Sequence, residues 1–160
     1  MKPYIYQINI KPETRKEVGL PKVKTRSANV LISGLDGDYN RFRNNKKNGD
    51  PDMALMILSL DIIKDLNIEG WPVKAGDLGE NLTVGNIEYR SLKPGNKYAV
   101  GSAKIEISFI CDPCSNLRVL PYVGSEKKLD FIKTLVSRRG WYARVLEPGK
   151  ITEKDLLLTI

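Results

Sequence analysis

Histidine is absent from this 160-residue sequence, and cysteine occurs only twice. Without an imidazole the chain cannot assemble a Ser-His-Asp triad or a Cys-His pair, so nucleophilic catalysis of those two kinds is excluded. A structural zinc site takes four ligands, which usually come from cysteine and histidine. Two cysteines cannot complete such a site within one chain, so that class of metal site is excluded as well.

Long apolar runs are missing too. No stretch approaches the roughly 18 apolar residues that span a bilayer, and the first residues, MKPYIYQ, alternate instead of forming the apolar region of a secretory signal. Two cysteines are also too few for a secreted disulfide scaffold. The hydrophobic fraction of 41% and the charged fraction of 28% are ordinary for a globular protein. We therefore expect a single cytoplasmic domain over residues 1–160, with no membrane partner.

Positive charge is in excess and unevenly spread. The net charge is +7, and residues 1–50 carry 11 Lys and Arg against 5 Asp and Glu. The densest stretch is RFRNNKK, in which Arg41, Arg43, Lys46 and Lys47 are candidate anion ligands. The same stretch is also typical of a solvated loop. A non-enzymatic anion- or nucleic-acid-binding barrel is one alternative, but no run of aromatic residues interleaved with basic ones favours nucleic acid as the partner.

Short alternating runs predict a mostly-β fold. Strands are expected at residues 4–10, 28–33, 81–89, 104–110 and 156–160. In the first run, alternation places Tyr4, Tyr6, Ile8 and Ile10 on one face. In the clearest run, KIEISFI, it places Ile105, Ile107 and Phe109 on one face. With few helical patterns between them, these strands predict a β-barrel with a few short helices.

Two helices and one long loop are expected between the strands. Ser59 is a candidate N-cap for a helix that begins at Leu60, and Asp61 in its first turn suits the helix dipole. Ser125 is a candidate cap for a second helix, with Leu129, Ile132, Leu135 and Val136 at helical spacing. Residues 34–52 are polar and rich in turn formers, which predicts a long loop that is either mobile or functional.

Both cysteines fall in one stretch, ICDPCSN, directly after the clearest strand. Four interpretations of Cys111 and Cys114 stay open on chemistry alone. The pair is a thiol–disulfide motif, half of a metal site shared by two chains, two packed structural thiols, or one reactive thiolate with a neighbour. Cys114 is the better reactive candidate, because Pro113 helps to set the turn before it. Basic residues such as Arg118, Arg139 and Arg144 would favour a thiolate if they lay nearby.

Several other motifs, taken in order, resemble one known family. They are GLDGD at residue 34, GDPDMAL at 49, GDLGENLTV at 76, Pro113-Cys114, and RGWYARVLEPG at 139. This ordered set is similar to the MOSC domain, the module named for the C-terminal part of molybdenum cofactor sulfurases, and most resembles its small stand-alone prokaryotic members. The resemblance runs from about Tyr6 to the C-terminus.

The resemblance implies a β-barrel with a pocket at one end and a functional cysteine at Cys114. In the family this cysteine is proposed to carry sulfur as a persulfide or to ligate the molybdenum of a molybdopterin cofactor, and relatives include reductases that use this cofactor. A cysteine desulfurase or another sulfur donor is then an expected partner, and a small molecule or cofactor an expected ligand. Further candidate ligand- or anion-binding residues are Arg41, Arg43, Lys46, Lys47, Glu80, Asn81, Arg139 and Arg144.

This sequence departs from the family pattern in two places. Many relatives carry histidine in the loop that here reads RNNKKNG, so an acid–base step that depends on histidine is not expected. Cys111 is not an expected family cysteine. It is a candidate resolving residue that would form a disulfide with an oxidised or persulfidated Cys114. Alternation continued from Phe109 instead places Cys111 with Ile105 and Ile107, which favours a passive buried thiol if that face is inward.

Overall fold

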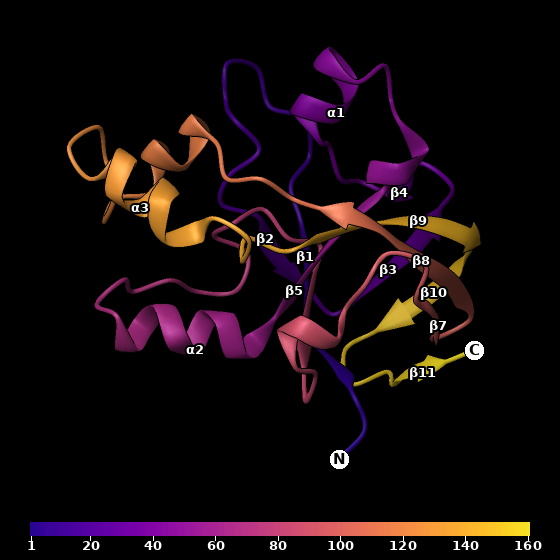
Figure 1. Cartoon of the computed structure of the whole chain (residues 1–160). Coiled ribbons are helices and arrows are strands. Elements are labelled where there is room, and N and C mark those ends of the chain that lie inside the picture. The colour runs from indigo at the N-terminus through magenta and orange to yellow at the C-terminus, as the bar shows by residue number, and fades with distance from the viewer.

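The computed structural model describes residues 1–160, and its regular elements are mainly strands with three α-helices (Figure 1). The strands are β1 (Tyr4–Ile10), β2 (Val23–Thr25), β3 (Ser27–Leu31), β4 (Gly34–Leu35), β5 (Leu55–Ser59), β6 (Leu82–Gly85), β7 (Lys97–Val100), β8 (Ala103–Ile110), β9 (Trp141–Glu147), β10 (Gly149–Thr152) and β11 (Leu157–Thr159). The helices are α1 (Arg41–Lys46), α2 (Leu60–Ile68) and α3 (Lys128–Leu135), and the 3-10 turns are η1 (Pro51–Met53), η2 (Tyr89–Ser91) and η3 (Ser115–Val119).

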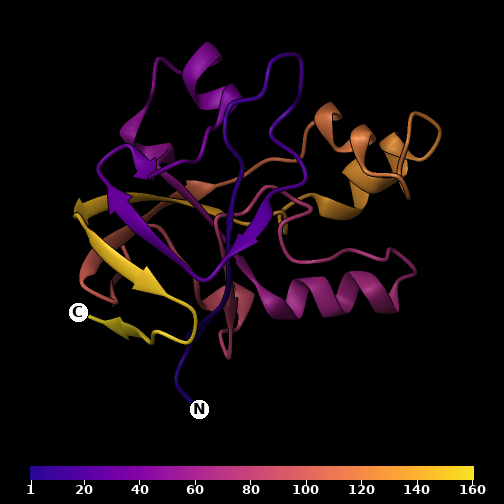
Figure 2. The ribbon, with the colours of Figure 1, turned by 180° about the vertical axis from the view of Figure 1, so that it is seen from behind.

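The strands form two sheets. The larger has the order β11-β7-β8-β9-β5-β6-β1-β2, and the smaller has the order β10-β3-β4. All pairs are antiparallel except β5 and β6, which α2 connects as a crossover helix. Figure 2, which shows the molecule from behind, places α2 and α3 together beside the sheets and α1 away from them, as Figure 1 does. No helix is both long and apolar enough to cross a membrane.

The predicted β-barrel is only partly confirmed, because the large sheet does not close on itself. One isolated bridge, Tyr4 to Leu156, joins β1 to the far end of the sheet beside β11. The reason lies in β1: it pairs with β6 over Tyr4–Ile8 and with β2 over Ile8–Ile10. Because β11 is only three residues long and β2 occupies part of the free edge of β1, no continuous ladder forms between β1 and β11.

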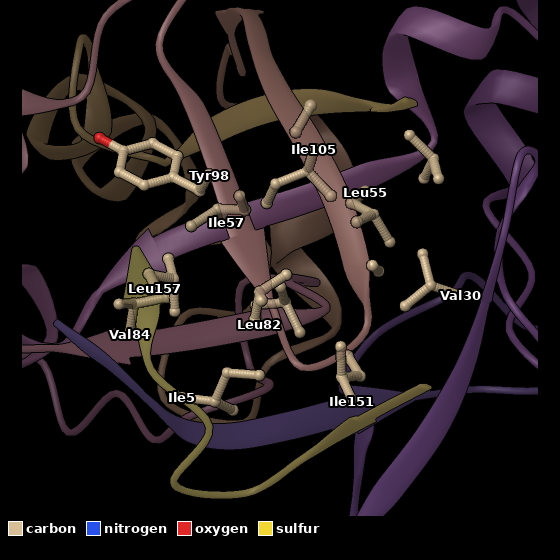
Figure 3. Packing of buried hydrophobic residues seen from close by; sticks show 14 of the residues in the cluster. Ile5, Val30, Leu55, Ile57, Leu82, Val84, Tyr98, Ile105, Ile151 and Leu157 are labelled. Carbon is tan, nitrogen blue, oxygen red and sulfur yellow. The ribbon is translucent and has the colours of Figure 1, made fainter. Parts of the chain in front are cut away.

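Two large hydrophobic clusters hold the fold together. The larger lies between the sheets and includes Ile5, Ile57, Leu82 and Ile105, whose side chains point toward one another in Figure 3. The second packs α2 and α3 against the turn that follows β8, with Phe131 fully buried at its centre. Full burial of one aliphatic or aromatic side chain contributes roughly 1.5–3 kcal/mol, so these clusters are the main stabilising contribution.

Strand positions were predicted better than the faces of the strands. The predicted runs at residues 4–10, 28–33, 81–89, 104–110 and 156–160 correspond to β1, β3, β6, β8 and β11, although β6 ends at Gly85, before the η2 turn. In β1 the predicted face is wrong: Ile5 and Ile8 are both buried, whereas Tyr6 is 45% exposed. The pairing of β1 with β6 shifts register between Ile5 and Gln7. Such a bulge reverses the alternation, because one extra residue moves the following side chains to the other face.

The two predicted helices had different outcomes. Helix α2 begins at Leu60 as expected, and the Ser59 hydroxyl accepts a hydrogen bond from the Asp61 amide. The predicted Ser125 cap is wrong, because α3 begins at Lys128 and Lys127 takes the cap position. Its predicted apolar face is only partly right: Leu129 and Val136 are 66% and 60% exposed, while the predicted Leu135 is buried together with Phe131. This pair has the i, i+4 spacing of one helix face.

The predicted long loop at residues 34–52 is folded over most of its length. It contains β4, α1 and the start of η1. The Asn40 side chain caps α1 by accepting a hydrogen bond from the Arg43 amide at 2.9 Å. Arg43 itself is only 7% exposed, and its guanidinium donates hydrogen bonds to three carbonyl oxygens, those of Ser33, Gly49 and Asp50. These contacts tie α1 to the residues that follow β3 and to those that precede η1.

Candidate functional site

A pocket of about 430 Å³ lies where several parts of the chain meet. Its walls come from the segment after β1, from α1 and the residues flanking it, from η1 and β5, from Gly79 before β6, from the end of β8 with the loop that follows, and from the start of β9. The lining includes four basic residues, Lys22, Arg41, Lys47 and Arg139, against two acidic ones, Asp50 and Asp112. A concave site of this volume is the size that small ligands occupy, and its excess of cations favours an anionic one.

Cys114 lines this pocket. It follows β8 by four residues and forms the N-cap of η3, with its carbonyl oxygen accepting a hydrogen bond from the Leu117 amide at 3.2 Å. Pro113, which precedes it, also lines the pocket. The thiol is partly exposed and free. A rigid strand end and turn therefore hold the sulfur atom at the pocket surface, where a small molecule can reach it.

Arg139 contacts the sulfur of Cys114 directly. Its Nη1 donates to Cys114 Sγ at 3.3 Å and to the Asp112 carbonyl oxygen at 2.9 Å, while Nη2 donates to the Leu78 carbonyl oxygen at 3.3 Å. The residue is only 8% exposed, and no carboxylate accepts a hydrogen bond from it. A buried guanidinium without an acidic partner stabilises negative charge on the neighbouring sulfur. The pair is thus arranged for thiolate chemistry.

Cys111 has a different environment. It is 2% exposed and packs in a small cluster with Met53, Met56 and Tyr142. Burial raises the pKa of its thiol, although the guanidinium of Arg139 opposes that shift. A buried thiol that stays protonated is a poor nucleophile. The two cysteines of ICDPCSN are therefore unequal: only Cys114 faces the pocket.

The end of β8 departs from the predicted alternation. Ile105 and Ile107 are fully buried, but Phe109 is 39% exposed and lines the pocket. The pairing of β8 with β9 shifts register between Ile107 and Ile110, which turns Phe109 outward. Cys111 is buried as continued alternation predicts, but it joins the small cluster around Tyr142 and not the core that holds Ile105.

The basic stretch of residues 41–47 divides into three kinds of position. Arg41 and Lys47 line the pocket, and Arg41 Nη1 donates to the Glu17 carbonyl oxygen at 2.7 Å. Arg43 is turned inward to the backbone carbonyls of its own segment, and Lys46 is exposed and not part of the lining. Arg41 and Lys47 are thus the two residues of this stretch that a ligand in the pocket would meet.

Arg144, Glu80 and Asn81 lie outside the pocket lining. Arg144 forms ion pairs of 2.7 Å with Asp52 and with Glu106, which tie β8 and β9 to η1. The Asn81 side chain accepts from the Met56 amide at 3.0 Å and donates to Asp38 Oδ2 at 2.8 Å. These contacts join β5 to the segment after β4. Arg144 and Asn81 therefore hold neighbouring elements together and do not face the pocket.

A buried polar network stands behind one wall of the pocket. Lys22 lines that wall, and its Nζ lies 2.6 Å from Asp38 Oδ2. Burial lowers the pKa of Lys22, and the Asp38 carboxylate opposes the shift. Glu80 is fully buried nearby, where its Oε1 accepts from the Gly76 amide at 2.6 Å and the Thr83 hydroxyl at 2.8 Å, while Oε2 has no partner. Burial raises the pKa of Glu80 to about 7.

The profile of the MOSC domain matches residues 44–157, which is most of the chain and includes Cys114, Arg139 and the Gly79-Glu80-Asn81 turn. The chain belongs to the MOSC domain family. None of the curated proteins matches it in sequence.

Solved structures share this MOSC fold at low sequence identity. The YUAD protein from Bacillus subtilis is 18% identical, with a TM-score of 0.78 over 97% of this chain and 93% of that one. YiiM from Geobacillus stearothermophilus is 22% identical, with a TM-score of 0.73 over 99% of this chain and 75% of that one. YiiM from Escherichia coli is 19% identical, with a TM-score of 0.67 over 98% and 69%. At these identities the likeness concerns the fold.

Sequence reasoning about this MOSC domain missed several pocket residues. Lys22, Phe42, Phe109 and Tyr142 all line the pocket, but no local pattern sets them apart from surface or core residues. For Phe109 no sequence signal existed, because the bulge that exposes it depends on pairing with β9.

Proposed function

We propose that this MOSC domain binds a molybdenum–molybdopterin cofactor in the pocket, with Cys114 as the thiolate ligand of the metal. The observation that supports this most is the 3.3 Å hydrogen bond from Arg139 to Cys114 Sγ inside a pocket lined by four cations. A thiolate is a ligand that such metals accept, and the cofactor carries a phosphate that cations bind. The residues present therefore fit the group.

Each residue has a distinct part in this proposal. Cys114 would hold the metal, and Arg139 would keep the sulfur anionic and in place. Arg41 and Lys47 would hold the phosphate, because both line the pocket and neither is in an ion pair with a carboxylate. When bound, the cofactor supplies a redox centre at the sulfur. Arg43 would contribute indirectly by fixing the segment that carries Arg41 and Lys47.

Metal and pterin analysis tests the cofactor proposal. The protein, made in a host that synthesises the cofactor, is expected to contain molybdenum and pterin in near-equal amounts. Cys114→Ser should remove the molybdenum, and Arg41→Ala with Lys47→Ala should lower the bound pterin at least tenfold, since two charge-assisted contacts are lost. Lys46→Ala, an exposed position on the same helix outside the pocket, should load like the wild type. Equal loading of Cys114→Ser would contradict the proposal.

Sulfur carriage is the second candidate, favoured by the exposure and polarity of the same thiol. In this reaction the Cys114 thiolate attacks the outer sulfur of a donor persulfide, such as that on a cysteine desulfurase. The donor S–S bond breaks, a new S–S bond forms at Cys114, and the donor cysteine leaves as a thiolate. Mass spectrometry after incubation with a desulfurase and cysteine should then find one added sulfur atom on Cys114. An unmodified Cys114, under conditions that load a known carrier, would count against it.

The two remaining alternatives have less support. A thiol–disulfide enzyme needs a second accessible thiol, and Cys111 is 2% exposed in an apolar cluster. A nucleic-acid-binding surface needs free cations along the basic stretch, but Arg43 is committed to three backbone carbonyls. Salt-sensitive nucleic-acid binding that survives Cys114→Ser would favour that alternative.

A further inference from the structure

The loop of residues 76–80, which directly precedes Asn81 and β6, is closed by the carboxyl group of Glu80. Its Oε1 accepts hydrogen bonds from the Gly76 amide at 2.6 Å and from the Thr83 hydroxyl at 2.8 Å. One oxygen atom therefore joins the first residue of the loop to its last residue and to β6. At Gly76 the φ angle is +95°, and a Cβ there would lie 2.5 Å from the Lys22 carbonyl oxygen. The path of the loop thus depends on this closure.

The middle of the same loop reaches Arg139. The Leu78 carbonyl oxygen accepts a hydrogen bond from Arg139 Nη2 at 3.3 Å, and a Cβ on Gly79 would lie 4.0 Å from that nitrogen. The other terminal nitrogen, Nη1, donates to Cys114 Sγ at 3.3 Å, while Nε is buried without a partner. Because the loop supplies the acceptor for Nη2, a movement of the loop would change how the guanidinium lies against the sulfur.

The charge on Glu80 affects the hydrogen bonds that close the loop. Burial raises the pKa of Glu80 to about 7, and the charge of Asp77 on the same loop acts in the same direction. The other ionisable groups near it are the Lys22 ammonium, which is paired with Asp38, and Tyr122, whose hydroxyl donates to Asp77 at 2.9 Å. An ionised carboxylate accepts stronger hydrogen bonds than a protonated one. The loop is therefore held more firmly when Glu80 is charged, although the buried charge lowers the overall stability.

We propose that Glu80 is a positioning residue for Arg139. Its carboxyl group holds the loop of residues 76–80 in place, and the Leu78 carbonyl oxygen of that loop orients the guanidinium. Through this connection, ionisation of Glu80 tightens the contact between Arg139 and Cys114 and favours the thiolate. The proposal rests on the reactive role of Cys114 in the proposed function, but not on which cofactor or sulfur species the thiol carries.

The pH profile of Cys114 alkylation tests this connection without any cofactor. In a Cys111→Ala background, the rate with iodoacetamide is measured between pH 5 and pH 9 and divided by the rate of Glu80→Gln at the same pH. The amide of Glu80→Gln still accepts hydrogen bonds but cannot ionise, so the ratio cancels the titration of the thiol. It should rise about threefold, with a midpoint near pH 7. Asp77→Asn should keep the rise, at a lower midpoint because a nearby negative charge is lost.

NMR observation of the Arg139 Nε–H group provides a direct readout. In Cys114→Ser, which removes the thiol, its ¹⁵N shift should titrate with the same midpoint, and Glu80→Gln in that background should abolish the titration. The Nε–H group of Arg138, which donates to the Thr134 carbonyl oxygen, is the internal reference and should not follow that titration.

Three results would overturn the proposal: a flat alkylation ratio, a ratio that falls with pH, or an Arg139 signal that titrates equally in Glu80→Gln. A falling ratio would show that the charge of Glu80 repels the thiolate directly. Metal and pterin content is measured separately, so the two proposals can fail independently. A flat ratio in protein that loads the cofactor contradicts only the role of Glu80. A rising ratio in protein that never loads it contradicts only the cofactor proposal.

Discussion

At the scale of single residues, the chemistry of the site depends on the contact between Arg139 and Cys114. The guanidinium is buried, has no carboxylate partner, and lies at hydrogen-bonding distance from the sulfur. The neighbouring Arg138 is its opposite: it forms a bidentate surface pair with Glu69 at 2.6 and 2.7 Å. Two adjacent arginines therefore have different tasks, one at the site and one between α2 and the end of α3.

Replacing Arg139 with glutamine should slow the chemistry of Cys114. The variant keeps a hydrogen-bond donor but loses the positive charge, and a hydrogen bond to a charged group contributes about 1.5–3 kcal/mol. The rate of alkylation by iodoacetamide at neutral pH should fall about tenfold. Arg138→Gln is the matched control and should react at the wild-type rate. An unchanged rate in Arg139→Gln would show that the contact does not activate the thiol.

Glu80 predicts a specific dependence of stability on pH. Its ordinary pKa of 4.5 rises to about 7 in the folded protein, because the carboxyl group is fully buried. Between these two values the unfolded chain loses the proton while the folded chain keeps it, so the free energy of unfolding falls as pH rises. The full loss is about 3 kcal/mol. Below pH 4.5 Glu80 causes no loss of stability, and well above pH 7 the loss stays at its full value.

Urea unfolding at pH 5 and at pH 7.5 measures this effect. Glu80→Gln, which cannot ionise, should lose less stability than the wild type between the two pH values. The difference should approach the size of the Glu80 contribution. If the wild type and Glu80→Gln lose stability in parallel, the carboxyl group does not titrate in this range in the folded state.

At the scale of elements, the segment of residues 34–52 brings the basic residues to the pocket. Its position depends on Arg43, whose guanidinium reaches the carbonyl oxygens of Ser33, Gly49 and Asp50. Sequence reasoning assigned Arg43 to ligand binding together with Arg41, Lys46 and Lys47. No local signal separates these four residues, because all of them lie within the seven residues 41–47. Only the fold determines which of them turns inward.

Arg43→Lys should loosen this segment. An ammonium group cannot reproduce the planar donor fork, so at least one carbonyl oxygen loses its partner, which costs about 2 kcal/mol. Hydrogen exchange of the amides between residues 44 and 50 should become faster, while exchange in β5 and β8 stays slow. Lys46→Ala, at an exposed position of the same helix, provides the comparison. Unchanged exchange in Arg43→Lys would mean that other contacts hold the segment.

At the scale of the whole molecule, the ordered motifs found in the sequence predicted the family, and alternation predicted five of the eleven strands, namely β1, β3, β6, β8 and β11. The open edge of the sheet, the buried face of β1 and the exposure of Phe109 at the end of β8 did not follow. The last two depend on register shifts, which arise from pairing between strands distant in sequence. For the same reason Cys114 was identified from its motif, whereas the pocket residues Phe42, Phe109 and Tyr142 were found only in the fold.

Native mass spectrometry of protein from a cofactor-synthesising host tests the central claim most directly. Wild type and Cys111→Ala should both carry a mass adduct equal to the molybdenum–pterin group, because Cys111 lies outside the pocket lining. Cys114→Ser should have the mass of the polypeptide alone. An adduct that persists in Cys114→Ser, or a wild-type protein with neither cofactor nor added sulfur at Cys114, would contradict the account.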